Sequence, residues 1–351
     1  MNPILLALAL SASPTKLGVF VAGDDATSKT LLAACPAVAV FRLPDDSAAQ
    51  TQIATLRQAC PQSTVVLQVG GSGAALGSLN LPTSDWSSTW LLQVTAAVGA
   101  ASGDWVEGPT EITVPVTLTG AQQLASYWNE FAWAVAGSGY RPVVGGLAPG
   151  VPAAVTLSDG GTENLFCQTL RTMASFSTTS PWAWSQHALA PSLDLSSTSP
   201  TLVYRTIAQQ CAAAGGPVNT TIFLTEAGRT TGAWQASDLT WLAWFDAQLQ
   251  QDGVAGAALY ESGATDRSLA PIATQLAAYL QNPSTPDGGT PDGGSDAGQS
   301  GGVASPGGSV PSGPPGNYKS GCASTGAGFA LLALLPPLVL ARRRRGQGVN
   351  R

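Results

Sequence analysis

Short apolar runs alternate with longer amphipathic stretches between residues 14 and 281. The apolar runs predict eight strands, at residues 17–22, 37–42, 64–69, 104–107, 142–147, 182–187, 221–226 and 255–260. Stretches between them, such as 121–136 and 240–249, carry apolar residues at helical spacing, which predicts helices with one buried face. This alternation indicates an α/β fold with a parallel sheet. We expect a (β/α)8 TIM barrel over residues 14–281, with a flavodoxin-like or Rossmann sheet as the alternative, because a single sequence does not show strand order.

The first 13 residues have a different character from the barrel. Residues 4–10 are apolar, and the small residues Ser11, Ala12 and Ser13 follow them, as at the cleavage site of a secretory signal peptide. The basic residue that usually precedes the apolar core of a signal is absent from this sequence. We interpret residues 1–13 as a signal peptide, with a misplaced start site or a buried strand as the alternatives.

The residues after the barrel fall into two parts. Residues 282–321 are rich in Pro, Gly, Ser and Asp, which predicts a disordered linker. Residues 322–351 contain Cys322, an apolar run at 326–341 and four arginines at 342–345. This order resembles the C-terminal sorting tails of myxobacterial surface proteins, which direct processing and surface anchoring. The resemblance implies that Cys322 marks the processing or lipid-attachment region. The alternative is a plain transmembrane anchor, and both place the barrel outside the cytoplasm.

The charge distribution separates the barrel from the tail. The chain carries a formal net charge of −6, with 21 acidic and 15 basic residues. All the acidic residues precede the tail, whereas Arg351 and the four arginines at 342–345 lie within it, so the barrel is more acidic than the whole chain. Binding to phosphates requires a basic surface, and we therefore expect no nucleic-acid partner.

Four cysteines lie in the barrel region, and their even number in an exported chain favours disulfides. Of the three connectivities that four cysteines allow, we favour Cys35 with Cys60, which would bracket one helix, and Cys167 with Cys211. Four buried free thiols are the alternative. The spacings do not match a metal site and the chain has one histidine, so we expect no metal and no organic cofactor.

Two glutamates stand out because each follows a short apolar run. Glu111 ends the sequence Asp104-Trp-Val-Glu-Gly-Pro-Thr-Glu111, and Glu226 ends Thr221-Ile-Phe-Leu-Thr-Glu226. Cleavage of a glycosidic bond requires two carboxylates, since one protonates the leaving oxygen while the other attacks or activates water. The interval between the two glutamates is close to three strand-plus-helix units of a TIM barrel, whose active site gathers residues from different strands.

These segments resemble two motifs of the retaining glycoside hydrolases of clan A. Residues 105–111 are similar to the EGPNE form of the strand-4 acid/base motif, and Leu224-Thr-Glu226-Ala-Gly228 is similar to the strand-7 nucleophile motif. The resemblance implies that Glu111 acts as acid and then base, that Glu226 forms a glycosyl ester, and that their carboxyl groups lie about 5 to 5.5 Å apart. An acid at neutral pH needs a raised pKa, which we expect Glu226 to impose on Glu111. The alternatives are a loop or helix-capping role for Glu111 and a solvated charge at Glu226.

The sequence departs from the family at Thr110, where the family has an asparagine that helps to hold the sugar 2-hydroxyl. A threonine hydroxyl is shorter and donates one hydrogen bond, so the departure bears on substrate positioning and on activity itself. Glu107 is the second candidate for the acid, or a buried partner of Arg42. Arg42 in turn matches an arginine that supports the nucleophile in the resembled enzymes, with a structural ion pair as its alternative.

Further candidates lie at the ends of predicted strands. His187, the single histidine, ends the sixth strand, where related barrels often place a hydrogen-bonding residue; a structural role is the alternative. Aromatic rings can stack on sugars, and Trp182, Trp184, Trp234 and Tyr260 are candidates that would also suit an ordinary core. We expect either Trp184 or Trp234, but not both, to contact the sugar.

The sequence therefore predicts an exported, surface-anchored retaining glycoside hydrolase that acts on a polysaccharide or glycoconjugate. A non-catalytic carbohydrate-binding or adhesive barrel is the rival, in which Thr110 records a lost activity. A structural surface protein with neither property is the third hypothesis.

Overall fold

The computed structural model describes residues 15–43, 48–176, 181–217, 220–261 and 266–283. The predicted signal peptide, nearly all of the predicted linker, and the tail with Cys322 lie outside the described residues.

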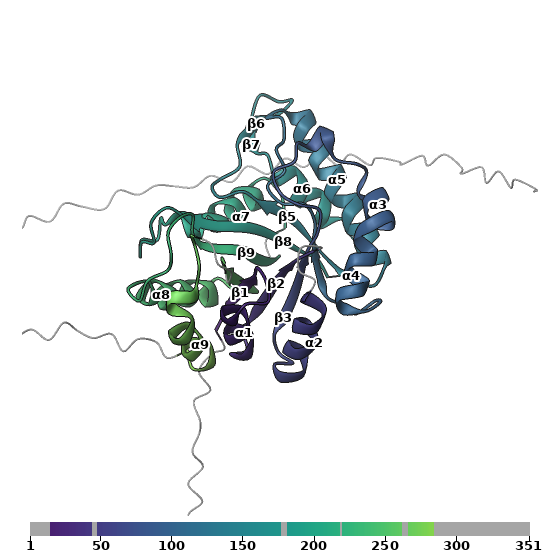
Figure 1. Ribbon diagram of the computed structural model, residues 1–351. Coiled ribbons are helices and arrows are strands. Elements are labelled where there is room, and N and C mark those ends of the chain that lie inside the picture. Colours follow the sequence, from purple (N-terminus) through teal and green to yellow (C-terminus); the bar gives the residue numbers. More distant parts are fainter. Residues whose placement is uncertain (1–14, 44–47, 177–180, 218–219, 262–265, 284–351) are drawn as a thin grey trace, which may run out of the picture. The chain divides into compact units, whose positions relative to one another are not determined.

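Eight parallel strands close into a barrel in the order β1-β10-β9-β8-β5-β4-β3-β2 (Figure 1). These strands are β1 (Leu17–Val21), β2 (Val38–Arg42), β3 (Thr64–Gln68), β4 (Trp105–Glu107), β5 (Arg141–Leu147), β8 (Ala183–Ala190), β9 (Thr221–Arg229) and β10 (Gly256–Leu259). Each overlaps one predicted strand, and the TIM-barrel prediction is confirmed. An open doubly wound sheet is excluded because the sheet closes on itself: the first strand, β1, pairs with β2 on one side and with the last strand, β10, on the other.

Helices surround the barrel (Figure 1). They are α1 (Ala26–Ala33), α2 (Ala49–Ala59), α3 (Pro82–Asp85), α4 (Leu91–Val98), α5 (Leu118–Gly137), α6 (Cys167–Ala174), α7 (Val203–Ala213), α8 (Asp238–Gln251) and α9 (Ala273–Gln281). The helices predicted at 121–136 and 240–249 lie within α5 and α8. A hairpin of β6 (Ala154–Thr156) and β7 (Thr162–Asn164) interrupts the connection from β5 to α6.

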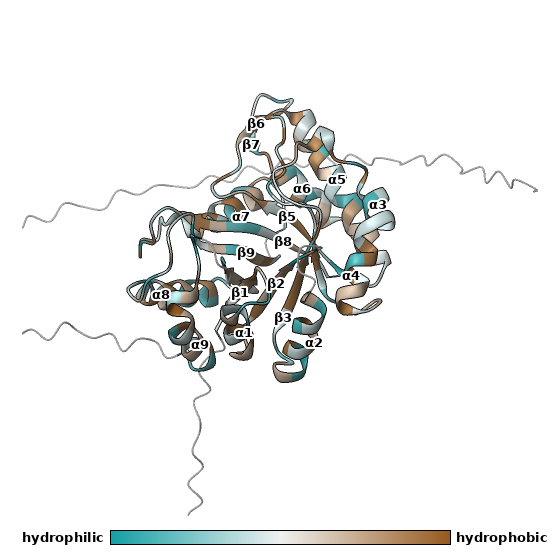
Figure 2. Cartoon of the chain, in the orientation of Figure 1, coloured by the Kyte–Doolittle hydropathy of each residue, from teal (hydrophilic) through white to brown (hydrophobic). Residues whose placement is uncertain are grey.

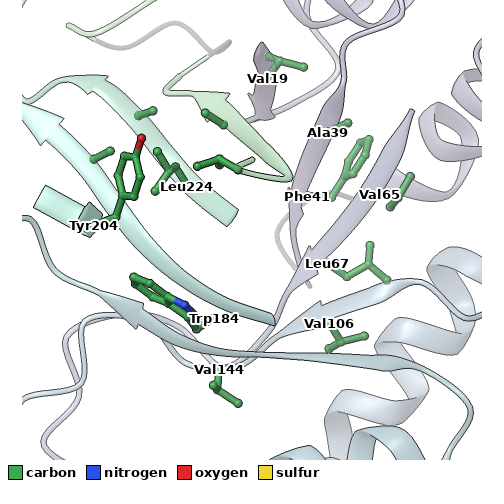
Figure 3. Packing of buried hydrophobic residues seen from close by; sticks show 14 of the residues in the cluster. Val19, Ala39, Phe41, Val65, Leu67, Val106, Val144, Trp184, Tyr204 and Leu224 are labelled. Atoms are coloured by element: carbon green, nitrogen blue, oxygen red, sulfur yellow. The ribbon is translucent and has the colours of Figure 1, made fainter. Parts of the chain in front are cut away.

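Alternating side chains of the strands form two apolar layers. The larger layer contains outward side chains of the strands, such as Phe41 and Leu67 (Figure 3). It also contains helix residues such as Trp128 and Phe131. The smaller layer fills the barrel with residues of the opposite parity, including Val40. Because both faces of these strands are buried, β2 and β3 are coloured as apolar along much of their length, whereas the helices show both colours (Figure 2).

Two barrel strands contain an extra residue near their carboxyl ends. Ser185 pairs with Phe223 and His187 pairs with Glu226, so β9 has one residue more than β8 over this interval. A second irregularity in β5 includes Gly145 and Gly146, which have φ angles of +111° and +48°. Bulges redirect side chains and are frequent beside functional sites.

Two disulfides join neighbouring elements, Cys35 with Cys60 and Cys167 with Cys211. Both pairs are the predicted ones, and the free-thiol alternative is wrong. Disulfides are typical of proteins that fold in oxidising compartments outside the cytoplasm. Among the described residues, the helices are too short or too polar to span a membrane.

Candidate active site

Polar side chains gather at the carboxyl ends of the barrel strands. Arg42, Gln68 and Glu107 are the last residues of β2, β3 and β4, and His187 and Glu226 lie in the carboxyl-terminal halves of β8 and β9. Because all eight strands are parallel, these ends meet at one face of the barrel, which is where TIM-barrel enzymes build their active sites.

Glu226 lies at the bulge of β9, and its side chain is 7% exposed. Arg42 Nη2 donates to Glu226 Oε1 at 2.9 Å. Burial raises the pKa of Glu226, and the positive charges of His187 and Arg42 partly oppose this effect. The nearby carboxylates of Glu107 and Glu111 raise the same pKa further.

Glu111 lies on the loop between β4 and α5, and its backbone is fixed from both sides. Its amide donates to the carbonyl of Gly146 at 2.6 Å, and the amide of Thr110 donates to the carbonyl of Gly71 at 3.0 Å. Glu111 itself has a φ of +53°, a region that non-glycine residues seldom adopt. Its side chain is 33% exposed, and Ser72 Oγ donates to its Oε2 at 3.0 Å.

His187 lies between the two glutamates. Its Nδ1 is 3.0 Å from Glu111 Oε1 and 3.6 Å from Glu226 Oε2. These two oxygens are therefore no more than about 6.6 Å apart, the sum of the two distances. Carboxyl groups of retaining glycosidases lie about 5 to 5.5 Å apart, and those of inverting enzymes about 6.5 to 9.5 Å. The arrangement thus suits acid/base or nucleophilic work on a bond held between the two carboxylates.

The pKa of Glu111 differs from our prediction. We expected Glu226 to raise it, but the hydrogen bond from His187 lowers it, burial opposes this effect, and Ser72 and Arg42 lower it further. Burial by itself would lower the pKa of His187, yet the hydrogen bond with Glu111 and the surrounding carboxylate charges leave it raised. The imidazole therefore lowers the pKa of Glu111 and opposes the rise in the pKa of Glu226, an effect that the prediction did not include.

Comparisons with known proteins do not assign this chain to a family. No protein-family model and no curated protein matches the sequence. A calcium binding mutant of Bacteroides uniformis beta-glucuronidase 2 is 9% identical, with a TM-score of 0.49 over 76% of this chain and 34% of that one. A GH128 endo-beta-1,3-glucanase from Sorangium cellulosum is 13% identical, with a TM-score of 0.42 over 72% and 89%.

A sugar phosphate isomerase/epimerase from Parabacteroides distasonis is also similar, at 9% identity and a TM-score of 0.45 over 80% of this chain and 99% of that one. Similarity at this level does not identify the reaction, which has to be argued from the side chains of the site.

Arg42 and Glu107 do not form the ion pair that we considered. Arg42 binds Glu226, and its Nε donates to Gln68 Oε1 at 2.7 Å. Glu107 is fully buried and accepts hydrogen bonds from Gln68 Nε2 at 3.0 Å and Thr225 Oγ1 at 2.9 Å, and from Ser185 Oγ. A carboxylate enclosed in this way is out of reach of a leaving group, so Glu107 is a poor second candidate for the acid.

Neither tryptophan that we proposed for sugar stacking presents a ring to solvent. Trp184 is fully buried in the layer between strands and helices, where its Nε1 donates to Thr220 Oγ1 (Figure 3). Trp234 is 1% exposed, and its Nε1 donates to the carbonyl of Tyr260. The expectation that one of the two contacts sugar is therefore wrong, because both rings are already covered by protein.

Thr110 and Tyr260 are also buried. The Thr110 hydroxyl has no hydrogen-bond partner among the described residues, and the residue is 0% exposed, so it does not offer the contact that we expected at this position by resemblance to the glycosidase motif. Tyr260 is 7% exposed, packs on Phe20 at 4.9 Å between ring centroids, and has Arg267 over its ring at 4.1 Å. Burial and the charge of Glu226 raise the pKa of Tyr260.

Sequence reasoning missed four polar residues that hold the site together: Gln68, Ser72, Ser185 and Thr225. Gln68 ends an apolar strand, as Arg42 does, so the same signal could have identified it. Ser185 and Thr225 sit inside apolar strands and carry no such signal. Among the residues that the structure describes, no cluster of His, Cys, Asp and Glu has an arrangement suited to a metal ion.

Proposed function

We propose that this protein is a retaining glycoside hydrolase that acts on an extracellular polysaccharide or glycoconjugate. The observation that supports the proposal is the shared contact of Glu111 and Glu226 with His187 Nδ1, at 3.0 and 3.6 Å, at the carboxyl ends of the strands. Two carboxylates at this separation can act on opposite sides of a glycosidic bond.

Glu226 is the proposed nucleophile. Its Oε1 is bound to Arg42, which favours the ionised form, while Oε2 lies 3.6 Å from His187 Nδ1. In the first step a Glu226 oxygen attacks the anomeric carbon, the bond to the leaving oxygen breaks, and Glu111 gives its proton to that oxygen. In the second step Glu111 takes a proton from water, and the resulting hydroxide displaces Glu226 from the ester.

The contact between His187 and Glu111 favours the second of these steps. A lowered pKa keeps the carboxyl group ionised, which is the form that the second step needs, whereas the first step needs the protonated acid. The leaving oxygen of a substrate would have to replace His187 as the partner of Glu111, which removes the main cause of the lowered pKa. We therefore expect substrate binding to prepare Glu111 for its first role.

The test is hydrolysis of a panel of polysaccharides by the purified full chain, with proton NMR of the first product. Release of sugar with retained anomeric configuration is expected. Release with inverted configuration would reject the two-step mechanism but keep the hydrolase. Variants Glu226→Ala and Glu111→Ala serve as the comparison, since contaminating hydrolases would act equally in all three preparations.

A carbohydrate-binding barrel without catalysis is the second candidate. It is favoured by the buried Thr110 hydroxyl, which replaces the family's asparagine, and by the ion pair that already occupies Glu111. Calorimetric binding of an oligosaccharide that the protein never cleaves, weakened by Arg42→Ala, would support this candidate and reject the hydrolase.

We also propose that the barrel is exported and held at the cell surface by its tail. The two disulfides agree with folding outside the cytoplasm. The proposal predicts that native protein lacks residues 1–13 and the segment after Cys322, and intact-mass measurement checks this. Recovery of the unprocessed chain from the cytoplasm would reject it.

A further inference from the structure

A chain of hydrogen bonds, buried at Glu107 and Gln68 and partly exposed at Arg42, connects Glu107 to the proposed nucleophile. Glu107 is 0% exposed and Gln68 is 2% exposed. Gln68 Nε2 donates to Glu107 Oε2 at 3.0 Å, Gln68 Oε1 accepts from Arg42 Nε at 2.7 Å, and Arg42 Nη2 donates to Glu226 Oε1 at 2.9 Å. Four neighbouring or facing strands of the barrel, β4, β3, β2 and β9, supply these four residues.

The direction of every bond in this chain is determined by its two ends. Glu107 accepts each of the hydrogen bonds that reach it, and a guanidinium such as that of Arg42 only donates them. The amide of Gln68 must therefore turn its nitrogen toward Glu107 and its oxygen toward Arg42. Arg42 is thereby held by its Nε, which leaves Nη2 directed at Glu226.

A second route leads from Glu107 to the same nucleophile. Glu107 Oε1 accepts from Thr225 Oγ1 at 2.9 Å, and Thr225 directly precedes Glu226 in the bulge of β9. Ser185 Oγ also donates to Glu107 Oε1, and it accepts from the amide of Gly146, whose carbonyl binds the amide of Glu111. One buried carboxylate is thus linked to the segments that carry both proposed catalytic glutamates.

We propose that Glu107 and Gln68 are positioning residues, which fix Arg42 and the bulge of β9 so that the Glu226 carboxylate stays aimed at the substrate. This inference rests on the proposed function, because it assigns the two residues a part in that reaction. Neither of them contacts substrate, since both are enclosed by the barrel.

The chain of donors and acceptors suggests a swap experiment. In Glu107→Gln, the new amide has two possible orientations. In one, its nitrogen faces the side-chain nitrogen of Gln68, and two donors meet. In the other, its nitrogen faces the hydroxyls of Ser185 and Thr225, which lose their acceptor. In the double variant Glu107→Gln with Gln68→Glu, the new Gln donates to the new Glu and still accepts from both hydroxyls, and the new Glu accepts from Arg42. All the bonds of the chain can then form again.

Gln68→Met breaks the chain without changing the charge of the protein. Gln52→Met is its matched control, because Gln52 is also a buried glutamine, 6% exposed, but bonds Gly23 and Asp24, neither of which belongs to the chain from Glu107 to Glu226. Thermal unfolding of all variants shows which of them remain folded at the assay temperature.

The first measurement is steady-state kinetics on a glycoside that the parent cleaves. We expect Glu107→Gln and Gln68→Met to lower kcat about 10-fold to 100-fold with KM changed less than about 3-fold, as for an interaction that acts in the transition state. The swap variant should return kcat to within about 3-fold of the parent. The Gln52→Met control should stay at the parent value.

The second measurement does not depend on catalysis. His187 is the only histidine, so its imidazole resonances in the NMR spectrum report one titration. His187 faces Glu111 and Glu226, with Glu107 close enough to act through its charge. Gln68→Met should raise the pKa of His187, because Glu226 loses the compensating charge of a well-placed Arg42, and Gln52→Met should leave it unchanged.

Unchanged kcat and an unchanged His187 titration in Gln68→Met would overturn the proposal. A swap variant no better than Glu107→Gln, or a Gln52→Met control as impaired as Gln68→Met, would also overturn it. If the parent cleaves no glycoside but the His187 titration changes in Gln68→Met as expected, the role of Gln68 in fixing Arg42 is kept and the proposed hydrolase is rejected. If the parent is active but neither kcat nor the His187 titration changes in Gln68→Met, the proposed hydrolase is kept and the positioning role is rejected.

Discussion

The loop that carries Glu111 and the strand that carries Glu226 present the same functional group in opposite surroundings. Glu111 follows β4 on a loop, with a side chain that is 33% exposed. Glu226 is part of β9, with a side chain that is 7% exposed. Both are within 3.6 Å of the same nitrogen of His187.

The difference shows that burial and hydrogen bonding can shift the pKa values of two neighbouring carboxyl groups in opposite directions. At Glu111 the hydrogen bond from His187 outweighs partial burial, and the pKa is lowered. At Glu226 burial outweighs the charges of His187 and Arg42, and the pKa is raised. These directions are opposite to the ones that the proposed roles require, since the acid needs the raised pKa, so substrate must displace His187 from Glu111 before the first step. The predictions below test whether the two roles differ as proposed.

Replacement of Glu226 should have the largest effect. Glu226→Ala removes the proposed nucleophile, and we expect a loss of kcat of roughly 10⁴-fold or more, because no glycosyl ester can form. Azide fits the space of the missing carboxylate and should restore turnover, with a glycosyl azide of inverted configuration as product. The check is NMR of the product. Loss without rescue at any azide concentration, in a folded variant, would count against the nucleophile assignment.

Replacement of Glu111 should slow some substrates and spare others, depending on the leaving group. Glu111→Ala should slow the cleavage of poor leaving groups by about 10² to 10³-fold, because they depart only when protonated, and spare activated aryl glycosides in their first step. Rates on a series of aryl glycosides with different leaving-group pKa values give this comparison. An equal loss across the series would contradict the acid role of Glu111.

Gly146→Ala should disturb Glu111 while leaving Glu226 in place. A Cβ at Gly146 would lie 2.7 Å from Thr110 Cγ2, and the carbonyl of Gly146 binds the amide of Glu111. We expect a loss of about 1 to 3 kcal/mol in the free energy of unfolding and roughly a 10-fold loss of kcat on poor leaving groups. Gly160→Ala is the control, because Gly160 has a φ of +85° but nothing within 4 Å.

His187→Gln should change the pH dependence of stability, the smallest of these effects. Because the folded pKa of His187 is raised above 6.5, His187 stabilises the parent fully below about pH 6.5, and this contribution is lost as the pH rises through the folded pKa. Urea unfolding of both proteins across pH 5 to 9, a range around the ordinary pKa of histidine, should show the parent's advantage shrinking as the pH rises. An advantage that grows with pH would contradict the raised pKa of His187.

The sequence was sufficient for much of the framework. Apolar runs bounded by polar residues located each barrel strand, because both faces of the strands are buried and the runs are nearly continuous. The same continuity concealed which face each side chain takes. Trp184 therefore could not be placed between strand and helix by pattern alone.

The site was predictable at the level of residues but not of contacts. Glu111, Glu226, Arg42 and His187 each follow or end an apolar run, and the structure brings all four together. The bulge at Glu226 and the glycine-rich irregularity of β5 depend on register between strands, which a single sequence does not contain. The predicted direction of the Glu111 pKa shift was wrong for the same reason. The shift is caused by a contact with His187, which lies 76 residues further along the chain.

The most direct test of the central claim is to trap the glycosyl-enzyme. A panel of activated 2-deoxy-2-fluoro glycosides slows hydrolysis of the ester, so peptide mapping by mass spectrometry can locate the sugar. The account predicts a single adduct on the peptide that contains Glu226, absent from Glu226→Ala and still formed in Glu111→Ala. An adduct on Glu111, or hydrolysis with inverted product and no adduct on any residue, would contradict it.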